Sequence, residues 1–495
     1  SFALPTELHH PSIRLGNNRR GSLPKACKTN PAGINFNNAE HFWEFGGFMV
    51  KFESSMGFQL LQSLLFVAVL VSGLYPFVRR IQRIRANIFR GQGTPATDRP
   101  ALRWRQMARV ALGQSKMGSR PIAAFFHVLI YVGFVLINLE LLEILLDGLL
   151  GTHRILSKPL GGLYPLMIGL FEWLGVGVII ACLVFLGRRM VHGPPRLYKA
   201  AELNGWPAWD AKVILIVEII LMGALLVMNA ADVAMHPGVY TFPVSGWLAN
   251  LFDGWSPEAL HATERIAWWL HLGGILAFLN YLPYSKHFHI VLAFPNTWYA
   301  SLEPAGTMTN MPVIQNEVQA MLNPSAPPVI SIDPPDRFGA ADVHDLPWKS
   351  LLDAYSCTEC GRCTSVCPAN ITGKKLSPRK IMMDTRDRLE ESDRWLQAHP
   401  EASKVEDGKN LLGDYITSEE ILACTSCNAC VEACPVLINP LNIILEMRRY
   451  QAMEASEMPS EWALMQGNIE NNGAPWAFPA ADRLAWAEQD PGTRS

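Results

Sequence analysis

Five long apolar stretches shape the first part of the chain. A helix that crosses a bilayer needs about 20 residues, and each stretch reaches this length with few or no charged residues inside it. The stretches span residues 54–78, 121–139, 161–187, 213–231 and 266–294. Their length and apolar character predict an all-α fold that begins with a five-helix transmembrane bundle over residues 54–295.

The segments around this bundle differ in character. Residues 1–53 show no apolar period and are expected to form a disordered or extended N-terminal tail. Prolines punctuate residues 296–347, which indicates an extended linker. Residues 348–455 follow a mainly helical pattern and contain most of the cysteines, so we expect a separate domain there. Residues 456–495 have no clear period and are expected to form a C-terminal tail.

The distribution of charge predicts how the bundle is oriented. Segment 79–120 holds eleven Lys or Arg residues against one acid, Asp98, and the segment between the third and fourth stretches is also basic. Short loops rich in Lys and Arg stay in the cytoplasm, whereas loop 232–265 is mainly acidic. We therefore expect an N-out, C-in protein of the cytoplasmic (inner) membrane of a bacterium or archaeon. The net charge of −2 gives no sign of a nucleic-acid partner.

Eight of the ten cysteines form two short motifs. Each motif has the spacing C-x₂-C-x₂-C-x₃-C and ends before a proline, Pro368 or Pro435. This is the spacing that binds 4Fe-4S clusters in two-cluster ferredoxins. The first motif consists of Cys357, Cys360, Cys363 and Cys367, and the second of Cys424, Cys427, Cys430 and Cys434. The domain at 348–455 is thus predicted to be a mainly helical 2[4Fe-4S] ferredoxin-like domain.

The spacing also predicts which cysteines share a cluster. Three thiolates separated by two residues wrap one face of a cluster, and the proline turns the chain so that the fourth cysteine reaches the other cluster. One cluster is therefore assigned to Cys357, Cys360, Cys363 and Cys434, and the second to Cys424, Cys427, Cys430 and Cys367. Two structural zinc sites are the alternative, but zinc usually takes two separated ligand pairs. Cluster thiolates need a reducing compartment, which agrees with a cytoplasmic C-terminal half.

Histidines inside the apolar stretches are candidate heme ligands, because such residues are rare and usually functional. His127 lies six residues after Pro121, and His289 lies six residues before Pro295. Both are thus expected roughly 9 Å inside the helix ends on one side of the membrane. Two imidazoles from antiparallel helices at this depth are placed to ligate one b-type heme.

A second heme remains an open hypothesis. If the fifth stretch is one helix, His271 shares a face with His289 and is positioned as a ligand, but the helix of His127 offers no second histidine as its partner. The alternative without heme is that His287 and His289 extend to the membrane interface and that His127 forms a hydrogen bond with a carbonyl oxygen. Four carboxylates within the stretches either conduct protons to a quinone or form structural pairs. These are Glu140, Glu143, Glu172 and Glu218.

The membrane half resembles a known family of cytochromes. Segments GQSKMGSRPIAAFFH (113–127), WWLH (268–271) and LPYSKHFHIVLAFPN (282–296) are similar to the cytochrome b (gamma-type) subunit of respiratory nitrate reductase and of membrane heterodisulfide reductase. The resemblance implies that His127 and His289 bind the heme on the cytoplasmic side. It also implies that His271 matches one ligand of an outer heme whose other ligand this chain lacks.

The cysteine-rich half resembles heterodisulfide reductase-like iron–sulfur oxidoreductases. Segments SCTECGRCTSVCPA (356–369) and ACTSCNACVEACPV (423–436) carry this likeness, and the similarity to fused members of the group runs from about residue 56 to 450. Family reductases use adjacent Cys-Cys pairs to build their substrate-reducing cluster, and this sequence has none. The expected partner is therefore a cysteine-rich-domain (CCG-type) iron–sulfur subunit or an electron-transfer flavoprotein.

Together these features predict the electron-transfer subunit of a quinone-linked, heterodisulfide reductase-like oxidoreductase. Two 4Fe-4S clusters and a b-type heme would pass electrons between a cytoplasmic donor and menaquinone or ubiquinone in the lipid bilayer. The sequence shows no nucleotide-binding or serine-hydrolase motif that offers another chemistry. The alternative is a membrane anchor that docks a partner or senses redox state without heme or quinone chemistry.

Overall fold

The computed structural model describes residues 56–191, 193–239, 242–304, 306–325 and 337–489. The predicted N-terminal tail, residues 1–53, lies outside this range. The chain divides into two units, residues 1–61 and 62–495. The described residues of the first unit are the beginning of helix α1 (Met56–Ile88). All other described helices belong to the second unit.

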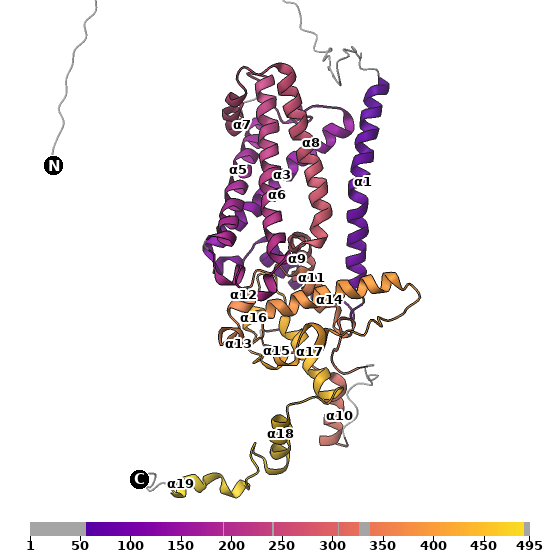
Figure 1. Ribbon diagram of the computed structural model, residues 1–495, viewed down its shortest axis with the longest axis vertical. Helices are drawn as coiled ribbons and strands as arrows, with labels where there is room; N and C mark the ends of the chain where they lie inside the picture. The colour runs from indigo at the N-terminus through magenta and orange to yellow at the C-terminus, as the bar shows by residue number, and fades with distance from the viewer. Residues whose placement is uncertain (1–55, 192, 240–241, 305, 326–336, 490–495) are drawn as a thin grey trace, which may run out of the picture. The chain divides into compact units, whose positions relative to one another are not determined.

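Five helices in the described part of the chain are long and apolar enough to cross a membrane. In chain order they are α1, α3 (Pro121–Leu150), α5 (Leu163–Met190), α6 (Trp206–Met235) and α8 (Pro257–Tyr281) (Figure 1). The described residues contain no β-strand among the named elements. The prediction of an all-α chain with five membrane helices followed by a helical domain is confirmed.

The membrane helices form their core from apolar side chains that face one another. Ile168 and Phe171 of α5 and Leu225 of α6 are fully or almost fully buried in this core. Helix α1 is different, because only 6% of its most apolar window is buried, so its sides suit contact with lipid. It approaches α8 at Gly73, whose carbonyl oxygen accepts a hydrogen bond from Asn280 at 2.7 Å.

The fifth apolar stretch is not one helix, which corrects the expected register of its histidines. Helix α8 ends at Tyr281, and two 3₁₀ turns follow it, at Leu282–Tyr284 and Lys286–Phe288. Helix α9 (His289–Trp298) then begins at His289. Pro283 lies within the first turn, and proline removes a backbone donor that a continuing helix would need. His271 and His289 therefore belong to different helices and do not share a helical face.

The cysteine-rich domain is a small helical core beside the end of the bundle. Its main helices are α11 (Trp348–Ser356), α14 (Pro378–Ala398) and α17 (Pro440–Met453), with the short helices α12 (Arg362–Ser365), α13 (Pro368–Ile371), α15 (Ser418–Leu422) and α16 (Ala429–Ala433) between them. Leu351, Ile381 and Ile443 are fully buried in this core. Helix α14 occupies part of the long insertion between the two motifs.

Part of the predicted linker belongs to this core. Val343 and Leu346 are fully buried with the helices of the cysteine-rich domain, so packing of this domain begins before residue 348. Helix α10 (Pro312–Leu322) lies within the same segment and has no buried residue. Two helices, α18 (Ser460–Asn472) and α19 (Ala485–Gln489), occupy the predicted C-terminal tail.

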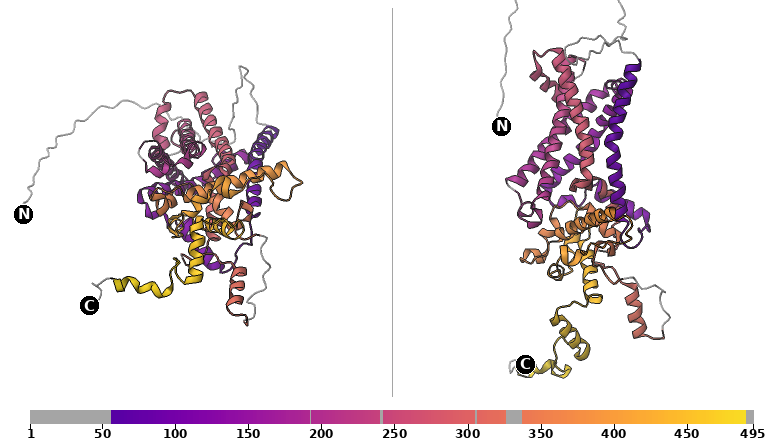
Figure 2. Two further views of the ribbon diagram at one scale, coloured as in Figure 1. Left: turned by 60° about the horizontal axis from the view of Figure 1, so that its bottom comes forward. Right: turned by 45° about the vertical axis from the view of Figure 1, so that its right-hand side comes forward.

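Direct contacts join the end of helix α1 to the cysteine-rich domain (Figure 2). Arg80 forms an ion pair of 2.6 Å with Glu390 of α14. Beyond the helix, the Gln92 amide donates to the Leu346 carbonyl at 2.8 Å, and the Trp348 amide donates to the Gln92 carbonyl at 3.0 Å. The membrane bundle and the cysteine-rich domain are thus joined by backbone hydrogen bonds as well as by side chains.

Gly91→Ala tests this close approach. An added Cβ would lie 2.6 Å from Trp348 Cα and 2.7 Å from its backbone nitrogen, so one backbone must shift, at a cost of about 1–3 kcal/mol. We expect the purified protein in detergent to unfold at a lower temperature. Gly118→Ala is the control, because its Cβ would meet no atom within 4 Å. Equal unfolding temperatures for the two variants would contradict the contact.

Candidate metal centre

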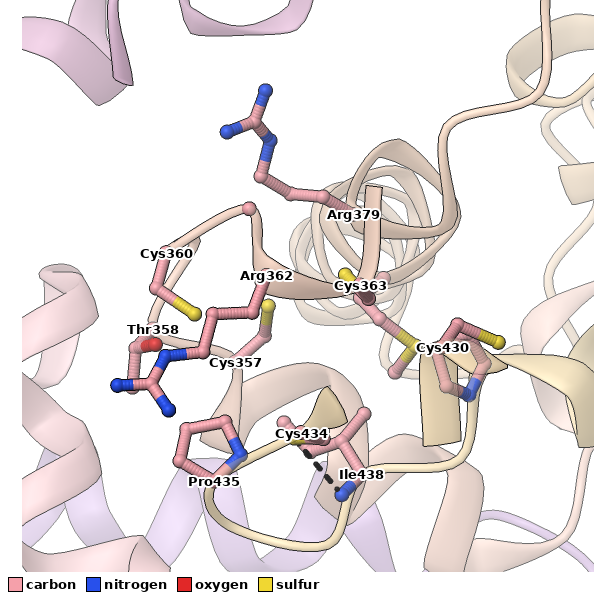
Figure 3. Close-up of a pocket in the computed structure, with 13 residues that line it drawn as sticks. Cys357, Thr358, Cys360, Arg362, Cys363, Arg379, Cys430, Cys434, Pro435 and Ile438 are labelled. Carbon is pink, nitrogen blue, oxygen red and sulfur yellow. Dashed lines mark hydrogen bonds between the residues drawn. The ribbon is translucent and has the colours of Figure 1, made fainter. Parts of the chain in front are cut away.

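The eight motif cysteines surround two neighbouring cavities. Cys357, Cys360, Cys363 and Cys434 line the first cavity, and Figure 3 shows their side chains around it. Cys367, Cys424 and Cys427 line the second cavity, and Cys430 borders both. The fourth cysteine of each motif therefore lies at the cavity of the other motif. The assignment of these thiols to particular clusters remains a prediction.

The two motifs use the same backbone device to gather their thiols. In each, the second and fourth residues after the first cysteine have left-handed φ angles. These are Glu359 (53°) and Gly361 (67°) in the first motif and Ser426 (55°) and Asn428 (60°) in the second. Gly and Asn adopt this conformation most readily. A one-turn helix follows in both cases, α12 or α16.

The chemistry of the lining suits an iron–sulfur cluster. No carboxylate lines either cavity in the described structure, and soft thiolates are the ligands that iron–sulfur clusters select. Burial raises the pKa of the Cys357 and Cys434 thiols to about 12, so they ionise only when a metal compensates for the loss of water. Backbone amides of Ser426 and Ile438 donate to Cys424 Sγ and Cys434 Sγ at 3.4 and 3.3 Å.

A single metal ion is a different case. Among the described residues, no three His, Cys, Asp or Glu side chains are grouped so that they could hold one ion. In a 4Fe-4S cluster each thiolate binds a different iron, so the thiols stand around the cluster instead of meeting at one point.

The structure brings two of the three predicted heme ligands together. The ring centroids of His127 and His289 are 6.4 Å apart, with an angle of 39° between their planes. His289 Nδ1 lies 3.0 Å from the Lys286 carbonyl oxygen, whereas buried His127 Nδ1 has no hydrogen-bond partner in the described structure. His271 stands on α8, where its Nδ1 lies 2.9 Å from the Leu221 carbonyl oxygen. His287 also joins the group, 5.6 Å from the His289 ring.

Lys286 links the first motif to this pair of histidines, and sequence reasoning did not assign it a role. Its ammonium group donates to a carboxylate oxygen of Glu359 and, at 2.7 Å, to the Pro207 carbonyl oxygen. Although burial opposes ionisation, Arg386 and Lys286 lower the pKa of Glu359. The available sequence signal was a lysine inside an otherwise apolar stretch, which needs a buried counter-charge.

Three of the four carboxylates within the membrane helices, Glu140, Glu143 and Glu172, accept hydrogen bonds. Glu143 accepts hydrogen bonds from the Leu156 amide and the Tyr164 hydroxyl, both at 2.9 Å. Glu140 accepts one from Asn229 at 3.0 Å, and Glu172 accepts from the amide of Val244 at 2.9 Å and from that of Ser245. These contacts are of the kind expected for structural pairing, and Glu218 lies apart from them, 3.9 Å from His287.

Residues 356–438 match the family model of the 4Fe-4S dicluster domain. The chain carries a 4Fe-4S dicluster domain. The match includes both cysteine motifs and supports iron–sulfur clusters as their cofactors. Together with the five membrane helices, it supports iron–sulfur electron transfer by a membrane protein.

Three curated relatives are similar to the chain. The "Probable iron-sulfur-binding oxidoreductase FadF" of Bacillus subtilis is 28% identical over 464 residues, which cover 88% of this chain and 62% of the relative. The "EtfAB:quinone oxidoreductase" of Syntrophomonas wolfei is 28% identical over 407 residues, which cover 77% of this chain and 53% of the relative. A "Probable membrane-anchored ferredoxin" of Chromohalobacter salexigens is 31% identical over 161 residues, 30% of this chain and 24% of the relative. No solved structure matches the chain.

The crossed grouping of the cysteines leads to a spectroscopic prediction. If Cys434 completes the cluster of the first motif, Cys434→Ser and Cys357→Ser should perturb the same electron paramagnetic resonance (EPR) signal, and each should remove up to about half of the bound iron. Cys367→Ser and Cys424→Ser should perturb the other signal. Cys182→Ala, a lone buried cysteine of α5, is the control. A Cys434→Ser spectrum that matches Cys424→Ser instead would contradict the grouping.

Proposed function

We propose that this chain is a membrane-bound electron-transfer subunit that connects a soluble redox partner to the quinone pool through two 4Fe-4S clusters and a b-type heme. The observation that carries the proposal is the junction at Lys286. This residue contacts Glu359 of the first motif through its side chain, and its carbonyl oxygen lies 3.0 Å from His289 Nδ1. The first cavity and the histidine pair are therefore adjacent parts of one path.

The side chains of the pair suit a shared heme iron. Their ring centres are 6.4 Å apart, and at nitrogen–metal distances of about 2 Å the two imidazoles would leave room for one iron atom between them. A carbonyl oxygen near Nδ1 of His289 is the neighbour that fixes the tautomer of a metal-binding histidine and leaves Nε2 for the metal. His127 and His289 would hold the heme, whose iron would supply a one-electron redox centre within the bilayer.

Exposure of the cysteines favours an order for the two clusters. Cys427 of the second cavity is exposed, whereas Cys357 and Cys434 of the first cavity are buried. A soluble partner would therefore exchange electrons with the cluster of the second cavity. The cluster of the first cavity would carry them to or from the heme, and the heme to or from quinone. In this arrangement the basic loops and the dicluster domain face the cytoplasm.

The names of two relatives support the identity of the redox partners. One relative is named as an EtfAB:quinone oxidoreductase, and another as a probable iron-sulfur-binding oxidoreductase. The chain spans 53% and 62% of these proteins. We therefore propose an electron-transfer flavoprotein or a CCG-type iron–sulfur subunit as the soluble partner and menaquinone or ubiquinone as the membrane substrate.

His127→Leu tests the heme proposal. We expect the purified wild-type protein to contain about one heme b per chain and to lose its reduced-minus-oxidised α-band in this variant, because one axial ligand is removed. The EPR signals of both clusters should persist. His153→Leu is the control, since His153 is a half-exposed residue beside Asp232 and outside the proposed pair.

Other outcomes would revise the proposal in definite ways. An unchanged α-band in His127→Leu would remove this residue as a ligand. Two hemes per chain would require a second ligand pair, with His271 as one member. A wild-type protein with clusters but no heme would favour the alternative of an anchor that docks a partner or senses redox state. Reoxidation of the reduced protein by a menaquinone analogue would then be absent.

A further inference from the structure

Several arginines surround the first cavity, and three of them have no carboxylate partner in the described structure. Arg362 is buried and donates to the Lys116 carbonyl and the Ser119 hydroxyl at 3.1 and 3.2 Å. Arg196 donates to the Cys360 carbonyl at 3.3 Å, and Arg120 donates to the Ser365 hydroxyl at 3.1 Å. We call Arg120, Arg196 and Arg362 the arginine collar.

Two members of the collar, Arg362 and Arg196, adjoin the first motif directly. Arg362 is part of the lining of the first cavity, and Figure 3 shows its guanidinium beside Cys360 and Pro435. Arg196 packs against Gly361. A Cβ added to Gly361 would lie 3.3 Å from the Arg196 carbonyl oxygen and 3.4 Å from the Arg196 Cβ. Arg379 also lines the cavity, but its guanidinium points away from the thiols and pairs with Glu202 at 2.8 Å.

The carboxylate of the first motif already has cationic partners. Glu359 pairs with Lys286 and, at 2.9 Å, with Arg386. This carboxylate is therefore already neutralised and does not compensate the collar. Of the collar, Arg362 is buried, whereas Arg120 and Arg196 are half-buried. A buried cation without a counter-ion is costly, so an anion beside Arg362 would stabilise it. A 4Fe-4S cluster with four thiolates carries net negative charge and becomes more negative when it accepts an electron.

The second motif lacks the key residue of the collar. The motifs align as C-T-E-C-G-R-C and C-T-S-C-N-A-C, so Ala429 stands where the first motif has Arg362, and Ser426 stands where it has Glu359. One arginine, Arg448, approaches the second motif and donates to the carbonyl oxygens of Ile421, Leu422 and Cys424. Arg448 thus resembles Arg196 in its contact with a cysteine carbonyl, and the first motif has Arg362 in addition.

We propose that the arginine collar, and Arg362 above all, raises the reduction potential of the cluster in the first cavity. Burial alone makes a cluster harder to reduce, because its extra negative charge is poorly solvated. Nearby guanidinium groups stabilise the reduced form and offset this effect. Reduction adds one electron, from the second cluster or from the heme according to the direction of flow, and no proton, so the collar acts through charge alone. This inference rests on the proposed assignment of clusters to the two motifs.

The test is an EPR-monitored redox titration of the purified full-length protein. Arg362→Ala gives the first motif the alanine that the second motif has at this position, Ala429. We expect the reduction potential of the first cluster to shift downward, while that of the second cluster stays unchanged. Arg362→Lys keeps the charge but not the forked donor, and it should restore most of the potential. Arg394→Ala removes an exposed arginine of α14 and should change neither cluster.

A reciprocal variant protects the test against misfolding of Arg362→Ala. Ala429→Arg introduces the cation at the matching position of the second motif and should raise the potential of the second cluster only. Unchanged reduction potentials in Arg362→Ala, or a shift in Arg362→Lys as large as that in Arg362→Ala, would overturn the proposal that the collar raises the potential of the first cluster. If Arg362→Ala loses its cluster, an unchanged potential in Ala429→Arg would overturn it. Absence of cluster signals and iron from the wild-type protein would instead overturn the proposed function.

Discussion

The attachment of the first cysteine motif to the loops at one end of the membrane bundle is the constraint on which the proposed electron path depends. Three separate loops hold it. The loop before α3 accepts hydrogen bonds from Arg362, the loop after α5 contributes Arg196, and the turn after α8 contributes Lys286. A motif held from three sides keeps a fixed distance to the histidines, since His289 follows Lys286 by three residues and His127 lies in the helix that begins directly after the first of these loops.

These attachments also explain why so many charged groups are buried at the junction. Glu359 is 5% exposed and lies between Lys286 and Arg386. A buried ion pair adds little net stability over apolar packing, but leaving one member unpaired is costly. Such pairs therefore favour one way of docking over the alternatives. An apolar contact between a membrane bundle and a soluble domain would tolerate sliding, which would change the separation of the redox centres.

Much of the architecture could be predicted because its signals are local. The five membrane helices follow from apolar length, and the dicluster domain follows from cysteine spacing. The break after Tyr281 was harder, because Pro283 alone does not say whether a helix bends or ends. The side chain of Ser285 accepts a hydrogen bond from the His287 amide and so stabilises the turn that replaces the helix. The contact between Lys286 and Glu359 joins positions far apart in sequence, and no periodicity within either segment encodes it.

The two motifs share one backbone conformation but differ in the side chains around them, and this difference underlies the proposed order of the two clusters. Both use left-handed residues at the same two positions and a one-turn helix before the fourth cysteine. The first motif has Glu359 and Arg362 where the second has Ser426 and Ala429, and the side chains of Glu359 and Arg362 contact the bundle. The second motif contacts the bundle through the exposed residue Glu432, which pairs with Lys116 at 3.4 Å, and its Cys427 is exposed. In the proposed path, two changes of residue type in a repeated motif distinguish the cavity that is held by buried contacts with the bundle from the cavity that has an exposed cysteine.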